Sequence, residues 1–131
     1  ALDSSGGSGP PDEQPGETLA GRCLGFLEKN VTFVNPAPAV SAALRFLNAL
    51  NLPKIDENED LQVSLVLHLC FMLERNICYK KLVYDGEADY IAQNRELYGL
   101  LRGGMPILEE NFDLTINDAE ICYIIQTINK S

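Results

Sequence analysis

The sequence predicts an all-α protein, a compact bundle of five or six helices. Apolar residues after position 38 recur at steps of three and four almost throughout, as they do on one face of an α-helix. No stretch of useful length alternates apolar and polar residues, as a half-buried strand would. Residue types that begin and end helices stand between the periodic segments. With 131 residues, 46% of them apolar, the chain has the size and composition of one domain.

The first 17 residues differ in composition from the rest of the chain. Residues 3–16 consist of Ser, Gly, Pro, Gln and acidic residues, so they offer no apolar side chain to a core. This composition predicts that residues 1–17 form a flexible acidic linker or tail. We expect a single helical domain over residues 18–131, with its first helix at residues 18–28.

Two further helices are expected in the middle of the chain. Apolar residues at helical spacing predict a helix over residues 40–50, which Pro53 ends. A long helix follows over residues 59–79. Asp56 and Asn58 are the candidate N-caps of this long helix, because their side-chain oxygens can accept from the free N–H groups of a first turn.

The next segment is predicted to form one medium and one short helix. Helical spacing of apolar residues indicates a helix over residues 88–101, and the pair Gly103–Gly104 is expected to end it. Pro106 then suits the first turn of a short helix that reaches Phe112, because a first-turn residue has no helical partner for its N–H.

A capping box predicts the last helix. Asn117 is followed three residues later by Glu120, a pattern in which each side chain accepts from the other residue's backbone N–H. The isoleucines that come after it, spaced at three and four, predict that the helix continues to about Ile128.

Charge and residue usage exclude several classes of function. The chain has 19 acidic and 10 basic residues, a formal net charge of −9, so we expect no direct contact with nucleic acid. A single histidine and four cysteines without a C-x-x-C pair lead us to expect no metal, cofactor or disulfide. The longest apolar run is too short to cross a bilayer, and no signal peptide leads the chain. We therefore expect a soluble, cytoplasmic protein with no membrane contact.

The predicted long helix contains the single histidine. Ten of the thirteen residues at positions 61–73 are apolar, and a helix that is apolar nearly all round belongs in the centre of a bundle. The three exceptions are Gln62, Ser64 and His68.

A narrow polar stripe runs along this helix. With His68 set to zero, a helical wheel places Ser64 near about −40° and Arg75 near about −20°. Phe71 and Met72 flank the stripe at about −60° and about 40°. This arrangement is typical of a cleft or of a face that meets a partner.

Two interpretations of His68 are open at this point. A lone histidine in a helix is most often a hydrogen-bonded core or boundary residue. Imidazole also titrates near neutral pH, and its neutral nitrogen is a nucleophile that can form a covalent phosphoryl adduct. Arg75 lies about 10 Å farther along the axis, so it could meet the added charge by reaching back or across a dimer.

Three segments resemble a known family. The long helix carries LVLHLCFMLERNI at residues 65–77, with an apolar residue three positions after the histidine and a basic residue seven after it. FVNPAPAV at residues 33–40 and NDAEICYII at residues 117–125 lie on either side in the sequence. Together they resemble the PTS regulation domain (PRD), particularly the C-terminal copy in sigma-54-dependent transcriptional activators of the levanase-operon type.

The resemblance implies a five-helix regulatory module, often dimeric, that is not an enzyme. It implies that the phosphocarrier protein of the sugar phosphotransferase system, or a sugar-specific EIIB component, phosphorylates His68 and so tunes the other domains of a transcription regulator. Ser64 and Arg75 are candidate supporting residues. Leu67 and Thr127 stand where many members have an aspartate and a second histidine.

Two other hypotheses stay open beside this one. The chain could be a purely structural or dimerising helical module in which His68 is never phosphorylated. An enzyme that pairs His68 with a cysteine thiolate is the third, although Cys70 points nearly away from His68 on the same helix, at about 200°.

Overall fold

A computed structural model describes residues 18–131, which form helices and no strand. The helices are α1 Leu19–Asn30, α2 Pro36–Leu50, α3 Pro53–Asp56, α4 Glu59–Ile77, α5 Glu87–Gln93, α6 Arg95–Phe112 and α7 Asp118–Asn129. The predicted all-α class is confirmed. The expected linker at residues 1–17 lies outside the described residues.

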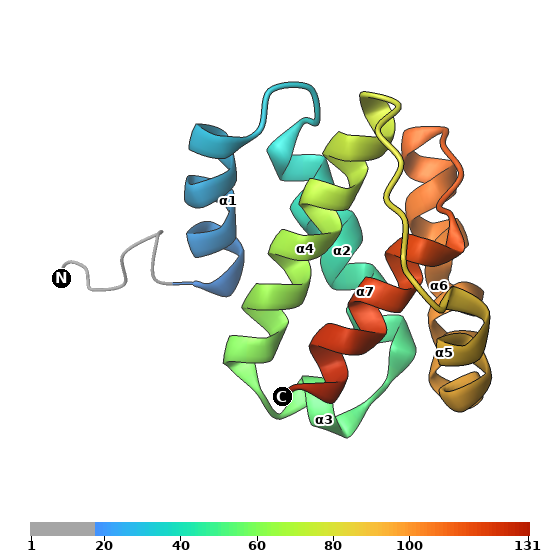
Figure 1. Cartoon of the computed structure of the whole chain (residues 1–131). Helices are drawn as coiled ribbons and strands as arrows, with labels where there is room; N and C mark the ends of the chain where they lie inside the picture. The colour runs from blue at the N-terminus through green and yellow to red at the C-terminus, as the bar shows by residue number, and fades with distance from the viewer. Residues whose placement is uncertain (1–17) are drawn as a thin grey trace, which may run out of the picture.

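Helix α4 lies at the centre of the bundle. It contacts α1, α2, α3 and α7, and Figure 1 shows α1 on one side of it, α7 on the other and α2 behind. Several of its side chains are fully buried in the core, among them Leu65, Val66 and Leu69. The apolar composition of this segment correctly predicted its central place.

Side-chain caps start three of the helices. Thr18 Oγ1 accepts from the N–H of Gly21 at 2.9 Å and begins α1. Asn58 Oδ1 accepts from the N–H of Leu61 at 3.0 Å, so Asn58, rather than Asp56, is the N-cap of α4. The predicted cap of the last helix is also present, since the Asn117 side chain accepts from a backbone N–H of the first turn.

The prediction of a helix ending at Gly103–Gly104 is wrong. Helix α6 runs through both glycines and through Pro106 to Phe112, so Pro106 lies inside a helix and does not begin one. The break comes earlier, at Asn94, where α5 ends and α6 begins. The Asn94 side chain donates to the carbonyl of Tyr90 at 2.9 Å, and this local bond competes with a regular helix. These changes, with the single turn of α3, bring the described helices to seven.

The close approach of α2 and α6 explains Gly104. A Cβ built at this position would lie 2.8 Å from Cε1 of Phe46 on α2. Glycine is required here because the two helices pack closely, and its conformational freedom plays no part.

A carboxylate holds the loop between α1 and α2 against α4. Glu74 accepts from the backbone N–H groups of Thr32, Phe33 and Val34 at 2.8 to 3.2 Å. These three hydrogen bonds lower the pKa of Glu74, against the raising effect of its desolvation. The loop is thereby fixed near the C-terminal end of α4.

None of the described helices combines the length and apolar character that a membrane span requires.

Candidate functional site

His68 lies midway along α4, the helix that contacts both α1 and α7, and is half-buried. Its Nε2 atom is buried and has no hydrogen-bond partner, which holds for no other buried side-chain nitrogen or oxygen within residues 18–131. A buried polar atom without a partner is costly, and in native proteins it often marks a functional position. Within the described chain, no hydrogen bond therefore holds this nitrogen of His68 in place.

The surroundings of His68 keep its side chain uncharged. Burial, and to a lesser degree the positive charge of Arg75, lower the pKa of His68 from 6.5 to about 4. At neutral pH one ring nitrogen therefore carries a free lone pair. A neutral imidazole of this kind can act as a nucleophile but not as a cationic partner.

Arg75 binds a buried carboxylate on α7. Its Nη2 lies 2.6 Å from Glu120 Oε1, and its Nε lies 3.1 Å from Glu120 Oε2. The Glu120 side chain is 1% exposed and that of Arg75 is 26% exposed. A bidentate pair of this geometry is strong and orients both groups. The structure thus brings Arg75 within electrostatic range of His68 and, at the same time, ties it to α7.

Glu120 has a role that the sequence pattern did not predict. The capping-box prediction is only half correct: Asn117 Oδ1 accepts from the N–H of Glu120 at 3.3 Å, but the Glu120 side chain turns to Arg75. A signal was present in the sequence. Glu120 shares a helix face with Ile124 and Ile128, both buried, so its carboxylate needs a cation from another helix.

Ser64 stays apart from the histidine. It is exposed one turn before His68, and no hydrogen bond within the described chain joins the two. Ser64 instead borders a shallow hollow together with Leu61 of α4 and Thr127 of α7. The hydroxyl of Thr127 donates to the carbonyl of Tyr123 at 3.0 Å. Of the three residues on the predicted stripe, only His68 and Arg75 influence each other, through the positive charge of Arg75.

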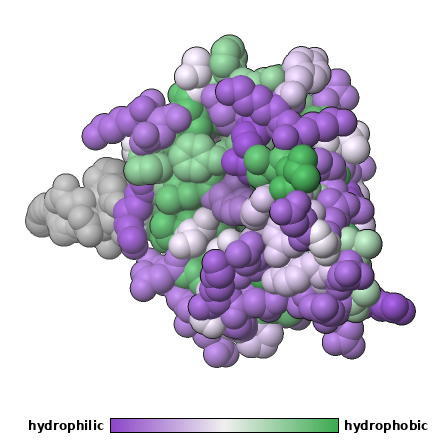
Figure 2. All heavy atoms as spheres, in the orientation of Figure 1, coloured by the Kyte–Doolittle hydropathy of each residue, from purple (hydrophilic) through white to green (hydrophobic). Residues whose placement is uncertain are grey.

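The two apolar residues that flank the stripe, Phe71 and Met72, differ in burial. Met72 is fully buried in the core, so it does not border the stripe at the surface. Phe71 is half-buried and packs edge-on against Phe26 of α1, with ring centroids 6.1 Å apart. Phe26 is 47% exposed. Figure 2 shows apolar side chains gathered over α1 and the adjoining part of α4, so the site has one apolar border.

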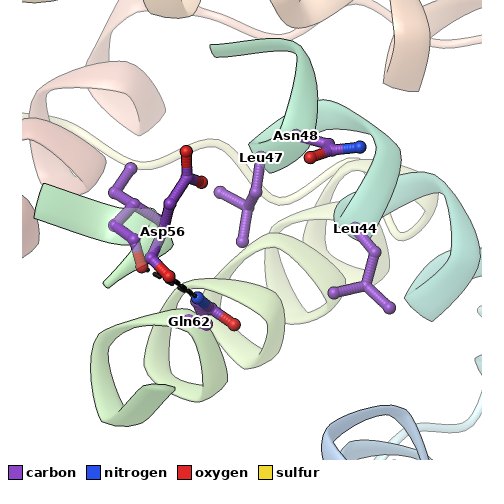
Figure 3. A pocket seen from close by; sticks show the side chains of 6 residues that line it. Leu44, Leu47, Asn48, Asp56 and Gln62 are labelled. Carbon is purple, nitrogen blue, oxygen red and sulfur yellow. Dashed lines mark hydrogen bonds between the residues drawn. The ribbon is translucent and has the colours of Figure 1, made fainter. Parts of the chain in front are cut away.

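A separate hollow lies between α2, α3 and α4, away from the stripe. It has a volume of about 360 Å³, and Leu44, Leu47, Asp56 and Gln62 are among its lining residues (Figure 3). The Gln62 amide donates to the carbonyls of Ile55 and Asp56 at 2.9 and 3.0 Å. Gln62 thus ties α3 to α4 and is not part of the His68 site.

The cysteines do not form a nucleophilic pair with His68. All four are free thiols, and Cys23, Cys70 and Cys122 are buried. Burial chiefly raises the pKa of Cys70 to about 12, so its reactive thiolate form is negligible at neutral pH. Within residues 18–131, no three His, Cys, Asp or Glu residues are placed to hold a metal ion together.

Comparison with known proteins gives one match. The sequence model of the PRD domain family matches residues 44–131, from the middle of α2 to the end of α7. His68, Arg75 and Glu120 all lie in the matched part, whereas the resembling segment at residues 33–40 precedes it. Neither the curated proteins nor the solved structures contain a match to the chain.

Proposed function

The chain belongs to the PRD domain family, the phosphorylatable regulatory domains of regulators controlled by the phosphotransferase system, and from this premise we propose that His68 is its phosphoacceptor. The donor is the phosphocarrier protein or a sugar-specific EIIB. Phosphorylation then modulates the activity and association of the parent regulator, for which a sigma-54-dependent activator of the levanase-operon type is our candidate. We also propose that the domain acts as a homodimer.

One observation carries this proposal: His68 is a neutral imidazole with an unpartnered ring nitrogen. In the transfer, the lone pair of a ring nitrogen forms a bond to phosphorus. The bond between phosphorus and the carrier atom of the donor breaks, its electron pair stays with the donor, and the donor takes up the proton that the imidazole loses. No cofactor is needed, and the family role is regulatory rather than catalytic.

Neighbouring residues support the product in different ways. The phosphoryl group adds a charge of roughly −1.5 to −2 and three acceptor oxygens. Arg75, already close enough to influence the His68 pKa, is the cation that answers this charge. Ser64, exposed one turn away, borders the same face of α4 and is expected to contribute less.

The test is phosphoryl transfer from phosphoenolpyruvate carrying labelled phosphorus. The chain is incubated with the energy-coupling protein, the phosphocarrier protein and a matching EIIB. We expect an acid-labile label that is lost when the phosphocarrier is omitted and in His68→Ala. The chain has no other histidine, so the variant gives a clean control. Absence of label in the wild type, or label that persists in His68→Ala, would contradict the proposal.

A second candidate function has a specific observation in its favour. Because His68 Nε2 is buried, a donor can reach that atom only if the side chain rotates. If the His68 side chain never rotates in this way, Nε2 is not phosphorylated, and the domain is a structural or dimerisation module. That alternative predicts that His68→Ala leaves both regulation by the parent protein and self-association unchanged.

A further inference from the structure

Arg75 lies between two groups that depend on its charge in opposite ways. It neutralises the buried carboxylate of Glu120, and it disfavours a positive charge on His68. We propose that Glu120 is a positioning residue of the His68 site, which holds Arg75 until a phosphoryl group on His68 draws the guanidinium away. The proposal rests on phosphorylation of His68 and assigns the step by which that event reaches α7.

Because Glu120 is buried, the packing of α7 on α4 is sensitive to the loss of its ion pair with Arg75. Glu120 is the one charged side chain that is buried among residues 18–131, and its carboxylate accepts hydrogen bonds from Arg75 alone in that part of the chain. Removing the cation from a buried carboxylate is strongly destabilising, because the charge loses both water and partner. The position of α7 against α4 therefore depends on where Arg75 directs its N–H groups.

A phosphoryl group competes directly for those N–H groups. Guanidinium binds phosphate and carboxylate through the same forked geometry, and phosphate carries the larger charge. In the described chain, the Nη1 atom of Arg75 forms no hydrogen bond, and the side chain is 26% exposed. Arg75 can thus first meet the phosphoryl group through Nη1, and its Nε and Nη2 then leave Glu120 as the guanidinium turns towards the phosphoryl oxygens. The new negative charge also repels Glu120, so both effects weaken the contact between α4 and α7.

Potassium phosphoramidate provides a test that needs no phosphotransferase protein. The imidazole lone pair forms the new N–P bond, the P–N bond of the reagent breaks, and ammonia leaves with the imidazole proton. We expect amide hydrogen exchange in the first two turns of α7 to rise by about tenfold on phosphorylation, a typical size for coupling between two sites. Exchange in α2, measured on the same samples, should stay the same.

Glu120→Gln and Glu110→Gln form a matched pair of variants. Glu110 is an exposed carboxylate on α6, so Glu110→Gln should respond to phosphorylation as the wild type does. Glu120→Gln has no charge for Arg75 to hold, so its α7 exchange should not change further on phosphorylation. Unchanged α7 exchange in the phosphorylated wild type, or a full response in Glu120→Gln, would overturn the positioning role.

If the reagent cannot reach the buried nitrogen, a permanent negative charge at position 68 takes the place of the phosphoryl group in the test. His68→Asp and His68→Asn differ only in charge, and Asp should speed α7 exchange relative to Asn when Glu120 is present but not in Glu120→Gln. Equal exchange in Asp and Asn would refute the positioning role. If phosphotransferase proteins leave His68 unlabelled while the reagent or His68→Asp moves α7, the proposed function fails and the role of Glu120 stands.

Discussion

Gly104 on α6 faces the ring of Phe46 on α2 so closely that a Cβ would lie 2.8 Å from Cε1 and 3.0 Å from Cδ1. The ring is fully buried, so it has no free space into which it can turn. Gly103, the preceding residue of the same helix, faces open space. The two glycines share one helix and differ only in what surrounds them.

Alanine substitutions at the two glycines should therefore have opposite effects. We expect Gly104→Ala to lower the free energy of unfolding by about 1–3 kcal/mol, because overpacking outweighs the gain in helix propensity. Gly103→Ala should raise it by about 0.5–1 kcal/mol through propensity alone. Urea denaturation of both variants measures the difference. Equal stabilisation by both would show that the Phe46 ring imposes no constraint.

The low pKa of His68 predicts a stability that depends on pH. The folded pKa of about 4 lies below the unfolded value of 6.5, so the unfolded chain binds more protons between these pH values. Stability present above pH 6.5 is lost as the pH falls towards 4. Relative to His68→Gln, the wild type should lose about 3 kcal/mol between pH 7 and pH 4. Parallel stability curves for the two proteins would contradict this.

Tyr79 should be replaceable by glycine with a gain in stability. It follows α4 in the left-handed region, with φ at 59°, and it is 93% exposed. A side chain with a Cβ is strained there, whereas glycine is not. We expect Tyr79→Gly to raise the free energy of unfolding by about 0.5–1 kcal/mol. Tyr79→Ala keeps the Cβ and should show no such gain; the comparison is made by thermal and urea unfolding.

The ion pair between α4 and α7 should show strong coupling. Arg75→Met leaves the Glu120 charge buried without a partner, so we expect a loss of about 3–5 kcal/mol. The double variant Arg75→Met/Glu120→Leu should recover most of this loss, since it removes the stranded charge. A double-mutant cycle from urea denaturation gives the coupling energy, and additive effects would show that the two side chains act independently.

Local patterns predicted the helices better than the contacts between them. The capping residues Asn58 and Asn117 each act on an N–H group three residues away, so the sequence alone located the starts of α4 and α7. Gly104 was wrongly predicted to end a helix, because a glycine is needed there to make room for the Phe46 ring on another helix. Helix α6 continues because its packing against α2 outweighs the weak helix propensity of two glycines.

The candidate site shows the same division. The helical wheel placed His68 and Arg75 on one stripe, because both belong to α4. It could not supply Glu120, which reaches the stripe only through the packing of α7 on α4. The unpartnered state of His68 Nε2 also depends on neighbouring helices, and no spacing along one helix encodes it.

The hydrogen bonds of Glu74 help to define where the segment that folds and unfolds as one unit begins. The family match starts at residue 44, in the middle of α2, yet Cys23 and Leu27 of α1 are in the core. Glu74 also accepts three N–H groups from the loop that precedes α2. A polypeptide cut at residue 44 would expose the α1-facing side of α4 to water and leave the Glu74 carboxylate without these donors. We therefore expect the segment that folds and unfolds together to start no later than Leu19, ahead of the family match.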